Sequence, residues 1–379
     1  MSMEQFFTRL EERVSKSPVK WFAPLIEATH SFLLTPGRAT RRGPFVRDNI
    51  DLKRYMFVVV VALLPVIAMS IYNIGRQAGI TEFWPAIWKG LMVMVPVIVV
   101  SYAVGGFWES IFAKIRGHEI NEGLLVTGIL FPLTLPPTIP LWQVAIGISF
   151  GIIIGKEVFG GTGMNLLNPA LTARAFLFFT YPGNISGDRV WAAVDGFSTA
   201  TPLATAAATD GNAIEALRAG SMDYSWLNMF NGHIPGSMGE TSTLAILIGA
   251  AILLITGIGS WRIMLATLLG GLGMASIIYF LAGSSATGMM SLPPTYHLVM
   301  GGFMFGTVFM TTDPVSAAGT NTGKWLYGIL IGVMVILIRT FNPAYPEGMM
   351  LAILFGNVFS PLIDHFVVQA NIKRRLRHV

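Results

Sequence analysis

Hydrophobic residues gather in ten runs along the chain, separated by shorter polar segments. A membrane-spanning helix needs about 20 mostly apolar residues. Runs of this kind lie at 56–75, 90–113, 122–136, 141–159, 167–182, 242–259, 262–282, 296–312, 325–340 and 347–365. The pattern predicts an all-α polytopic membrane protein with about ten transmembrane helices. The third, fifth, eighth and ninth runs are short for a full span, which predicts broken or half-membrane helices.

The two halves of this pattern resemble each other weakly. The segments Glu122–Thr138 and Gly302–Ser316 are both apolar and interrupted by proline. In each half a Trp-led apolar run follows, and then an Asn-Pro-Ala sequence that begins at Asn168 or Asn342. Five spans in each half would make the second copy inverted. Inverted repeats with broken helices are how many transporters build a site at the bilayer midplane.

The polar segments divide the chain into five parts. We expect a cytoplasmic arm at 1–55, a first transmembrane repeat at 56–182, an outer loop at 183–241, a second repeat at 242–365 and a cytoplasmic tail at 366–379. Ten of the 25 Lys and Arg residues precede residue 56 and four follow residue 372. Cytoplasmic segments carry an excess of such residues, so both termini are predicted in the cytoplasm and the outer loop in the periplasm of a Gram-negative bacterium.

Two smaller features belong to these polar parts. The amphipathic stretch Met3–Val14 fits either a helix lying on the bilayer surface or a solvated tail. The outer loop contains a helical pattern at Asn212–Arg218. A loop of this length with its own helix is typical of a functional segment rather than a plain connection.

Composition agrees with a membrane protein and excludes some chemistry. Only 12% of residues are charged, about half of the roughly 25% typical of soluble domains, and mean hydropathy is +0.63. The chain has no cysteine, which excludes disulfides, thiolate-bound zinc and cysteine-ligated iron–sulfur clusters within it. Its six histidines are scattered, so no metal site is visible. The basic ends are explained by membrane topology rather than by nucleic acid.

Six carboxylates lie within or beside the apolar runs, where an ionisable group costs a few kcal/mol and indicates a functional site. They are Glu109, Glu122, Glu157, Asp313, Glu347 and Asp364. The alternative for each is a carboxylate at the membrane surface or paired with an arginine. We favour this alternative for Glu122, Glu157 and Glu347, and weigh the two interpretations equally for Glu109 and Asp313.

The neighbours of these last two acids suggest different ligands. Glu109 follows Gly105 and Gly106, which would let a partner or a flat ligand approach the backbone. Asp313 precedes Pro314 at a helix break, where freed carbonyl groups and a carboxylate suit a hard cation such as Na⁺.

Two polar stretches could hold a larger ligand. The glycine-rich segment Gly160–Pro169 opens a helix that carries Arg174, and such loops present N–H groups to anions or ligand carbonyls. In the stretch Asp195–Pro202, a threonine before proline is held extended, which would expose the Thr201 hydroxyl for modification. From spacing alone, a helix connection and a plain turn are the favoured interpretations of these two segments.

Several motifs in order nevertheless make the chain resemble one family, the B subunits of the Na⁺-translocating NADH:quinone oxidoreductase. The resemblance runs nearly end to end. The motifs are Lys20–Ala23, Val46–Asp48, Asp51–Arg54, Gly105–Glu109, Lys156–Gly163, Asn165, Asn168–Ala170, Arg174–Phe179, Ile185–Asp188, Thr312–Ser316, Asn342–Gly348 and Asn371–Leu376.

This resemblance implies a ten-helix subunit that holds FMN and riboflavin and takes part in ubiquinone reduction. In the family, a flavin transferase joins FMN by a phosphoester to the threonine of a Ser-Gly-Ala-Thr motif. The matching residues are Ser198–Thr201, so Thr201 would be the acceptor. Thr199 stands where glycine is usual, which makes Thr199 a rival acceptor.

The resemblance also assigns roles to residues elsewhere. It implies riboflavin contacts at Asn165 and Asn168, and quinone contacts at Gly105, Gly106, Glu109 and Trp21. It implies a Na⁺ pathway through Asp313, Asp364, Glu109 and Glu27. The partners it implies are subunits that carry the NADH site, the iron–sulfur centres and a second FMN.

Three functions stay open on the sequence. The first is a flavin-carrying subunit that passes electrons from covalent FMN through riboflavin to ubiquinone, coupled to Na⁺ export across the bacterial inner membrane. The second is the related D subunit of the Rnf complex, which couples ferredoxin and NAD. The third is a solute channel or transporter with inverted repeats and no bound flavin. The N-terminal arm with Trp21 and the basic tail Asn371–Arg377 favour the first.

Overall fold

The computed structural model describes residues 9–10, 13–14, 52–117, 123–194, 199–220, 222–283, 286–342 and 345–377, and all of its regular structure within them is helical. The first half contains α3 (Leu52–Gln77), α4 (Phe83–Arg116), α5 (Gly123–Leu133), α6 (Leu141–Ile153) and α7 (Pro169–Thr180). The second contains α12 (Thr243–Ile255), α13 (Trp261–Ala282), α14 (Tyr296–Val299), α15 (Phe303–Phe305), α16 (Asn321–Phe341) and α17 (Met349–Leu376). Between the halves lie α8 (Pro182–Ile185), α9 (Pro202–Ala208), α10 (Ala213–Ala219) and α11 (Trp226–Asn231).

Helix lengths and hydropathy confirm a polytopic α-helical membrane protein. In the described ranges, six helical segments are long and apolar enough to cross a membrane, namely α3, α4, α13, α16, α17 and the segment Leu141–Phe159 that includes α6. Helices α5 and α12 are shorter apolar helices. Helices suit this environment because all their backbone polar groups are satisfied within the segment.

The expectation of short or broken helices holds for three runs. The third and fifth runs form α5 and α7, of 11 and 12 residues. The eighth run is divided into α14, α15 and a five-residue π-helix at Gly306–Met310. A π-helical stretch of this kind frequently marks a functional site.

For the ninth run the expectation of a short helix is wrong. Helix α16 has 21 residues because the Thr320 hydroxyl accepts a hydrogen bond from Gly323 N at 3.0 Å. This cap starts the helix on polar residues that a hydropathy count leaves out. In the sixth run, α12 has only 13 residues, and the chain turns beyond it at Gly257, whose φ is +71°.

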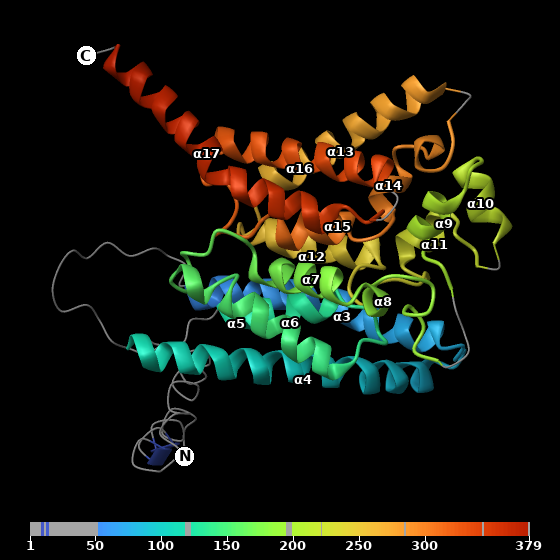
Figure 1. Cartoon of the computed structure of the whole chain (residues 1–379), viewed down its shortest axis with the longest axis horizontal. Helices are drawn as coiled ribbons and strands as arrows, with labels where there is room; N and C mark the ends of the chain where they lie inside the picture. The colour runs from blue at the N-terminus through green and yellow to red at the C-terminus, as the bar shows by residue number, and fades with distance from the viewer. Residues whose placement is uncertain are drawn as a thin grey trace.

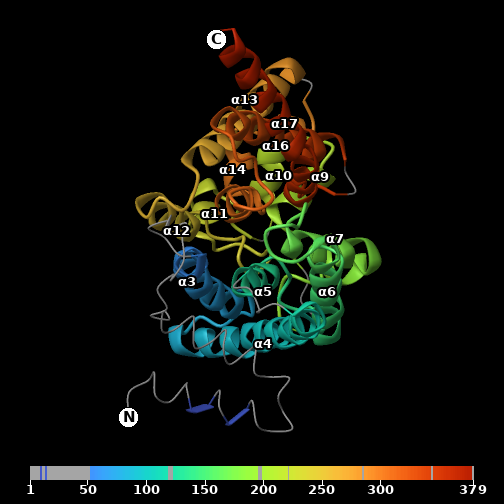
Figure 2. The same ribbon diagram turned by 90° about the vertical axis from the view of Figure 1, so that its left-hand side faces the viewer.

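The helices form two groups with two short helices at their junction. Helix α4 packs on α3, α5 and α6, while α16 packs on α13 and α17. Contacts of α12 with α3 and of α7 with α17 join the groups, and both views place α7 and α12 between them (Figures 1 and 2). These contacts join equivalent helices, since α3 and α12 come first in their halves and α7 and α17 come last. The division into two inverted five-helix repeats stays a prediction.

Helices α9, α10 and α11 gather at one end of the bundle (Figure 1). They share a small hydrophobic core with residues of the second half; its largest members include Leu203, Leu217, Met229, Met289 and Met300. The predicted helix at 212–218 is confirmed as α10, whose first turn is capped by the Asn212 side chain accepting from Ile214 N at 2.9 Å.

Glycines allow α13 and α16 to approach closely. A Cβ added to Gly270 would lie 2.6 Å from the carbonyl oxygen of Ile329, and one on Gly332 would lie 2.5 Å from Gly271 N. Small residues at helix interfaces are typical of membrane proteins, since they let backbones come together.

Gly270→Val should therefore force α13 and α16 apart and destabilise the bundle. Overpacking of this kind costs about 1–3 kcal/mol, measurable as a lower midpoint of thermal unfolding in detergent. Gly273→Val on the same helix is the control, because a Cβ there has no heavy atom within 4 Å. Equal midpoints for the two variants would show that this contact does not limit the packing.

Candidate functional site

Two pockets lie near opposite ends of α12. The first, here called the Asn168 pocket, is lined by Leu253 near the end of α12. The second, the Thr201 pocket, is lined by Thr241 just before α12.

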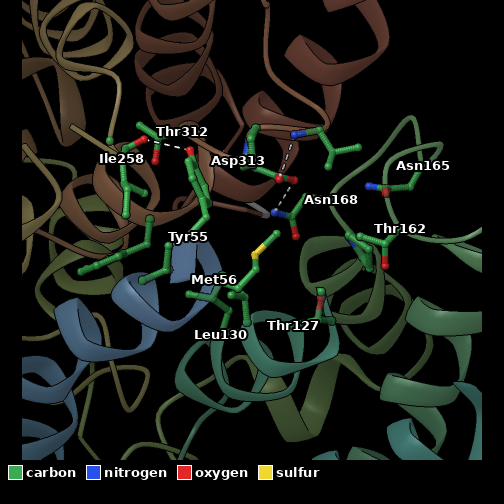
Figure 3. Close-up of a pocket in the computed structure, with 18 of the residues that line it drawn as sticks. Tyr55, Met56, Thr127, Leu130, Thr162, Asn165, Asn168, Ile258, Thr312 and Asp313 are labelled. Atoms are coloured by element: carbon green, nitrogen blue, oxygen red, sulfur yellow. Dashed lines mark hydrogen bonds between the residues drawn. The ribbon is translucent and has the colours of Figure 1, made fainter. Parts of the chain in front are cut away.

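In the Asn168 pocket, two residues far apart in sequence come together (Figure 3). Asn168 caps α7, since its side-chain oxygen accepts from Ala170 N at 3.0 Å and Leu171 N at 3.3 Å. Its amide nitrogen donates to the Asp313 carboxylate at 3.4 Å. The sequence suggested different ligands for Asn168 and Asp313, but the structure puts them in one wall.

The half-buried Asp313 carboxylate has only neutral hydrogen-bond donors in the described part of the chain. It accepts from Ser316 Oγ at 2.8 Å and Val315 N at 3.2 Å, besides Asn168. No arginine or lysine forms an ion pair with it within the described ranges. A carboxylate shielded from water without a cationic partner is costly, so this position suits a bound cation.

The glycine-rich segment forms another part of the same wall. Gly160, Gly161 and Gly163 have φ angles of +123°, +100° and +93°, which residues with a Cβ rarely adopt. The segment also contains Asn165, a buried lining residue whose amide donates to Leu167 O at 3.0 Å. The loop therefore has a fixed shape that brings both asparagines to the pocket.

Glu109 lies in the interior in an ion pair with Lys156, which also lines the Asn168 pocket. Both side chains are nearly fully buried. A second pair, Arg116–Glu157 at 3.1 Å, likewise joins α4 to the segment that follows α6. The Arg-paired interpretation of Glu157 is confirmed, and Glu109 is paired with a lysine.

The other described residues implied for the quinone and for Na⁺ lie outside both pockets. A Cβ on Gly105 would lie 2.9 Å from Ile152 Cδ1 and Leu124 Cδ1, so this glycine serves helix packing. Asp364 accepts from Gly319 N at 2.6 Å and Thr320 N at 3.0 Å, next to the start of α16. Gly106 lines neither pocket, and Trp21, Glu27 and Glu122 lie outside the described residues.

Thr201 begins α9 and lines the second pocket. Its backbone is extended, with φ −70° and ψ 158°, as the following proline predicts. Its hydroxyl oxygen accepts from Ala204 N at 3.2 Å, and the residue is half-buried rather than exposed at a turn. The cap and the pocket wall together hold the hydroxyl in one place.

The rival threonine has different surroundings. Thr199 is 8% exposed, its backbone N–H donates to Asp188 O at 2.8 Å, and it does not line the pocket. The Tyr224 hydroxyl donates to the Ala200 carbonyl between the two threonines, and burial raises the pKa of Tyr224. Ser198 of the same motif lies outside the described residues.

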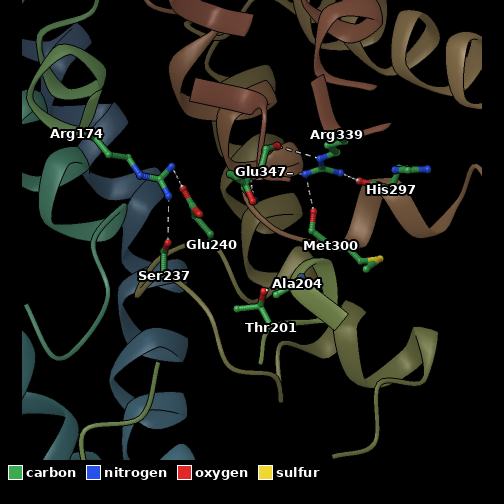
Figure 4. A network of polar contacts seen from close by, with 10 residues as sticks. Arg174, Thr201, Ala204, Ser237, Glu240, His297, Met300, Arg339 and Glu347 are labelled. Atoms are coloured by element: carbon green, nitrogen blue, oxygen red, sulfur yellow. Dashed lines mark hydrogen bonds and ion pairs between the residues drawn. The ribbon is translucent and has the colours of Figure 1, made fainter. Parts of the chain in front are cut away.

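Two ion pairs flank the Thr201 pocket, and only Glu347 among their four side chains is half-buried rather than buried (Figure 4). Arg174 of α7 pairs with Glu240 at 3.2 Å and reaches Ser237 Oγ at 3.4 Å. Arg339 of α16 pairs with Glu347 at 3.6 Å, which confirms the Arg-paired interpretation of Glu347. Sequence reasoning missed this network, although a cation within each of two apolar runs was a usable signal.

The Arg339–Glu347 pair also forms hydrogen bonds with backbone groups around the broken segment that contains α14 and α15. The Arg339 guanidinium donates to the carbonyls of His297 at 2.7 Å, Met300 at 2.9 Å and Glu347 at 3.0 Å. The Glu347 carboxylate accepts from Gly302 N at 2.7 Å. Buried ion pairs are tolerated when such hydrogen bonds satisfy their remaining donors and acceptors.

The fold and these two pockets define a polytopic helical membrane protein that holds polar sites inside an apolar bundle. The chain belongs to the NQR2, RnfD, RnfE family, whose model matches residues 39–373.

Curated relatives cover nearly the whole chain. It is 51% identical to the B subunits of the Na(+)-translocating NADH-quinone reductases of Pseudomonas aeruginosa and Azotobacter vinelandii, each over 99% of both chains. It is also 51% identical to the corresponding protein of the same name from Chromohalobacter salexigens, over 94% of this chain and 91% of the relative.

Arg174→Met should destabilise the protein strongly, by about 3–5 kcal/mol, because it leaves Glu240 buried without its cation. The double variant Arg174→Met/Glu240→Gln should recover a large part of that loss. Thermal unfolding of the purified chain in detergent measures both. A double variant no more stable than Arg174→Met would show that charge pairing is not what Arg174 contributes.

Proposed function

We propose that this chain is the flavin-carrying membrane subunit of a Na⁺-translocating NADH:ubiquinone oxidoreductase in the bacterial inner membrane. In this role it passes electrons from FMN covalently bound at Thr201 through riboflavin to ubiquinone, coupled to Na⁺ export. The observation that carries the proposal is that Thr201, the last residue of the flavin-attachment motif, lines a pocket together with aromatic side chains and the Arg174–Glu240 ion pair. The names of these relatives support the assignment to this complex.

The residues of the Thr201 pocket fit a flavin. Trp191, Phe178, Ile185 and Leu203 offer apolar and aromatic surface for a flat ring system, while the ion pairs offer polar edges. A phosphoester at the Thr201 hydroxyl would fix one end of the cofactor at the pocket wall. Flavins supply the electron transfer, and the protein supplies their binding, orientation and electrostatic surroundings.

We propose the Asn168 pocket as the riboflavin site, with Asn165 and Asn168 as its polar contacts. Helix α7 joins the two sites, since Pro169 lines the Asn168 pocket and Arg174 and Phe178 line the other. At a rise of 1.5 Å per residue, Arg174 lies only about 8 Å beyond Pro169 along the helix. One helix thus carries lining residues of both pockets, which supports electron transfer between cofactors bound in them.

We also propose that Asp313 is the part of the Na⁺ pathway that lies beside this riboflavin site. Its carboxylate lines the Asn168 pocket and receives only neutral donors in the described ranges. Glu109, Asp364 and Glu27 remain proposed members of the pathway, and Gly105, Gly106, Glu109 and Trp21 proposed quinone contacts.

The remaining parts of the proposal concern partners and topology. Subunits with the NADH site, the iron–sulfur centres and a second FMN would complete the electron path, since this chain has no cysteine to hold such a cluster. A flavin transferase would attach the FMN. Both termini would lie in the cytoplasm, as the basic residues at both ends favour.

Thr201→Ala should abolish flavin attachment in the chain co-expressed with its flavin transferase. We expect the parent chain to carry one FMN phosphoester on the peptide containing residues 195–203, measured by peptide mass and in-gel flavin fluorescence. Thr199→Ala is the matched control and should retain the flavin, because Thr199 lies outside the pocket. Loss of the adduct in Thr199→Ala with retention in Thr201→Ala would contradict the assignment.

Asp313→Asn should weaken the Na⁺ dependence of quinone reduction in the assembled complex. Loss of the charge should raise the Na⁺ concentration for half-maximal rate by about tenfold or more, which corresponds to about 1.4 kcal/mol of binding free energy. Asp223→Asn in the outer loop, an exposed position away from both pockets, is the control. An unchanged Na⁺ dependence in Asp313→Asn would remove Asp313 from the pathway.

A further inference from the structure

The Tyr345 side chain lines the Thr201 pocket with an unused hydroxyl group. The residue is 6% exposed, and its hydroxyl oxygen has no hydrogen-bond partner among the described residues. Most buried side-chain polar atoms in folded proteins are hydrogen-bonded. An unpaired hydroxyl on a residue that lines a pocket therefore indicates a polar atom of a ligand as its partner.

Neighbouring side chains hold the Tyr345 ring in position. The Phe178 ring packs against it with the ring centroids 4.3 Å apart and the planes inclined at 64°. Phe178 lies one turn after Arg174 on α7, so both residues face the same pocket. The ring is thus fixed by packing, while its hydroxyl is left for another group.

The nearby charged groups already have partners. Arg174 is occupied by Glu240 and Ser237, and Arg339 by Glu347 and three backbone carbonyls. Within the described lining, the Tyr345 hydroxyl is therefore the buried polar group of the pocket that lacks a partner.

We propose that the Tyr345 hydroxyl donates a hydrogen bond to the polar edge of the isoalloxazine ring of a flavin tethered at Thr201. This rests on the proposed function, which supplies the flavin. The ring edge carries two carbonyl oxygens and imine nitrogens that accept hydrogen bonds, and a phenol hydroxyl is a suitable donor. Tyr345 is then a binding residue that tunes the electron affinity of this flavin.

The test compares Tyr345→Phe with the parent in the complete complex, expressed with its flavin transferase. Tyr345→Phe removes only the hydroxyl and should leave the flavin attached at Thr201. We expect the infrared band of the flavin ring carbonyls to move to higher frequency, because a carbonyl that loses a hydrogen bond has a stiffer bond. The oxidation–reduction equilibrium of this flavin should change by about tenfold, or about 59 mV for a one-electron step.

Ser101→Ala is the matched control. It removes another buried hydroxyl without a partner in the described structure, on α4 and away from both pockets. It should leave the band and the potential unchanged.

The outcomes separate this inference from the proposed function. An attached flavin whose carbonyl band and potential are the same in Tyr345→Phe, Ser101→Ala and the parent overturns the role of Tyr345 and leaves the proposed function standing. Absence of flavin from Thr201 in the parent overturns the proposed function, and the role of Tyr345 with it.

Discussion

A helix that ends inside an apolar bundle leaves backbone groups that no water can satisfy, and the rest of this structure depends on how those groups are satisfied. Asn168 caps the start of α7, and Arg339 and Glu347 bond backbone groups around the broken segment near α14 and α15. Replacing these polar side chains by apolar ones would leave the backbone groups without hydrogen-bond partners. Short helices therefore bring polar side chains into the interior, and the pockets form around them.

Helix α7 shows how this constraint produces two sites from one element. Its first residues belong to the Asn168 pocket, and Arg174 and Phe178 belong to the Thr201 pocket. A full-length spanning helix would keep its two ends about 30 Å apart, whereas α7 has 12 residues. One short helix thus carries lining residues of both pockets, and its contact with α17 ties both to the second half.

Hydropathy predicts the helices well because every residue of a span contributes to its average. It fails where a single polar contact determines where a helix begins or ends. The cap at Thr320 extends α16 beyond its apolar run, a local hydrogen bond that no average over residues detects. The Asn168–Asp313 contact and the Arg174–Glu240 pair join residues 145 and 66 positions apart. Sequence identified Asn168 and Asp313 as chemically notable, but only the packing of the two halves could bring them together.

The two pockets also differ in charge. Around the Thr201 pocket, two arginines balance two glutamates. In the Asn168 pocket, Lys156 is matched by Glu109, and Asp313 is left with neutral donors in the described part of the chain. On the proposed function, an electron arriving in the Asn168 pocket adds negative charge beside an unbalanced carboxylate. In a low-dielectric interior such charges repel strongly, so an electron in this pocket would add to the attraction that Asp313 exerts on a cation, whereas the carboxylates of the Thr201 pocket are already paired with arginines.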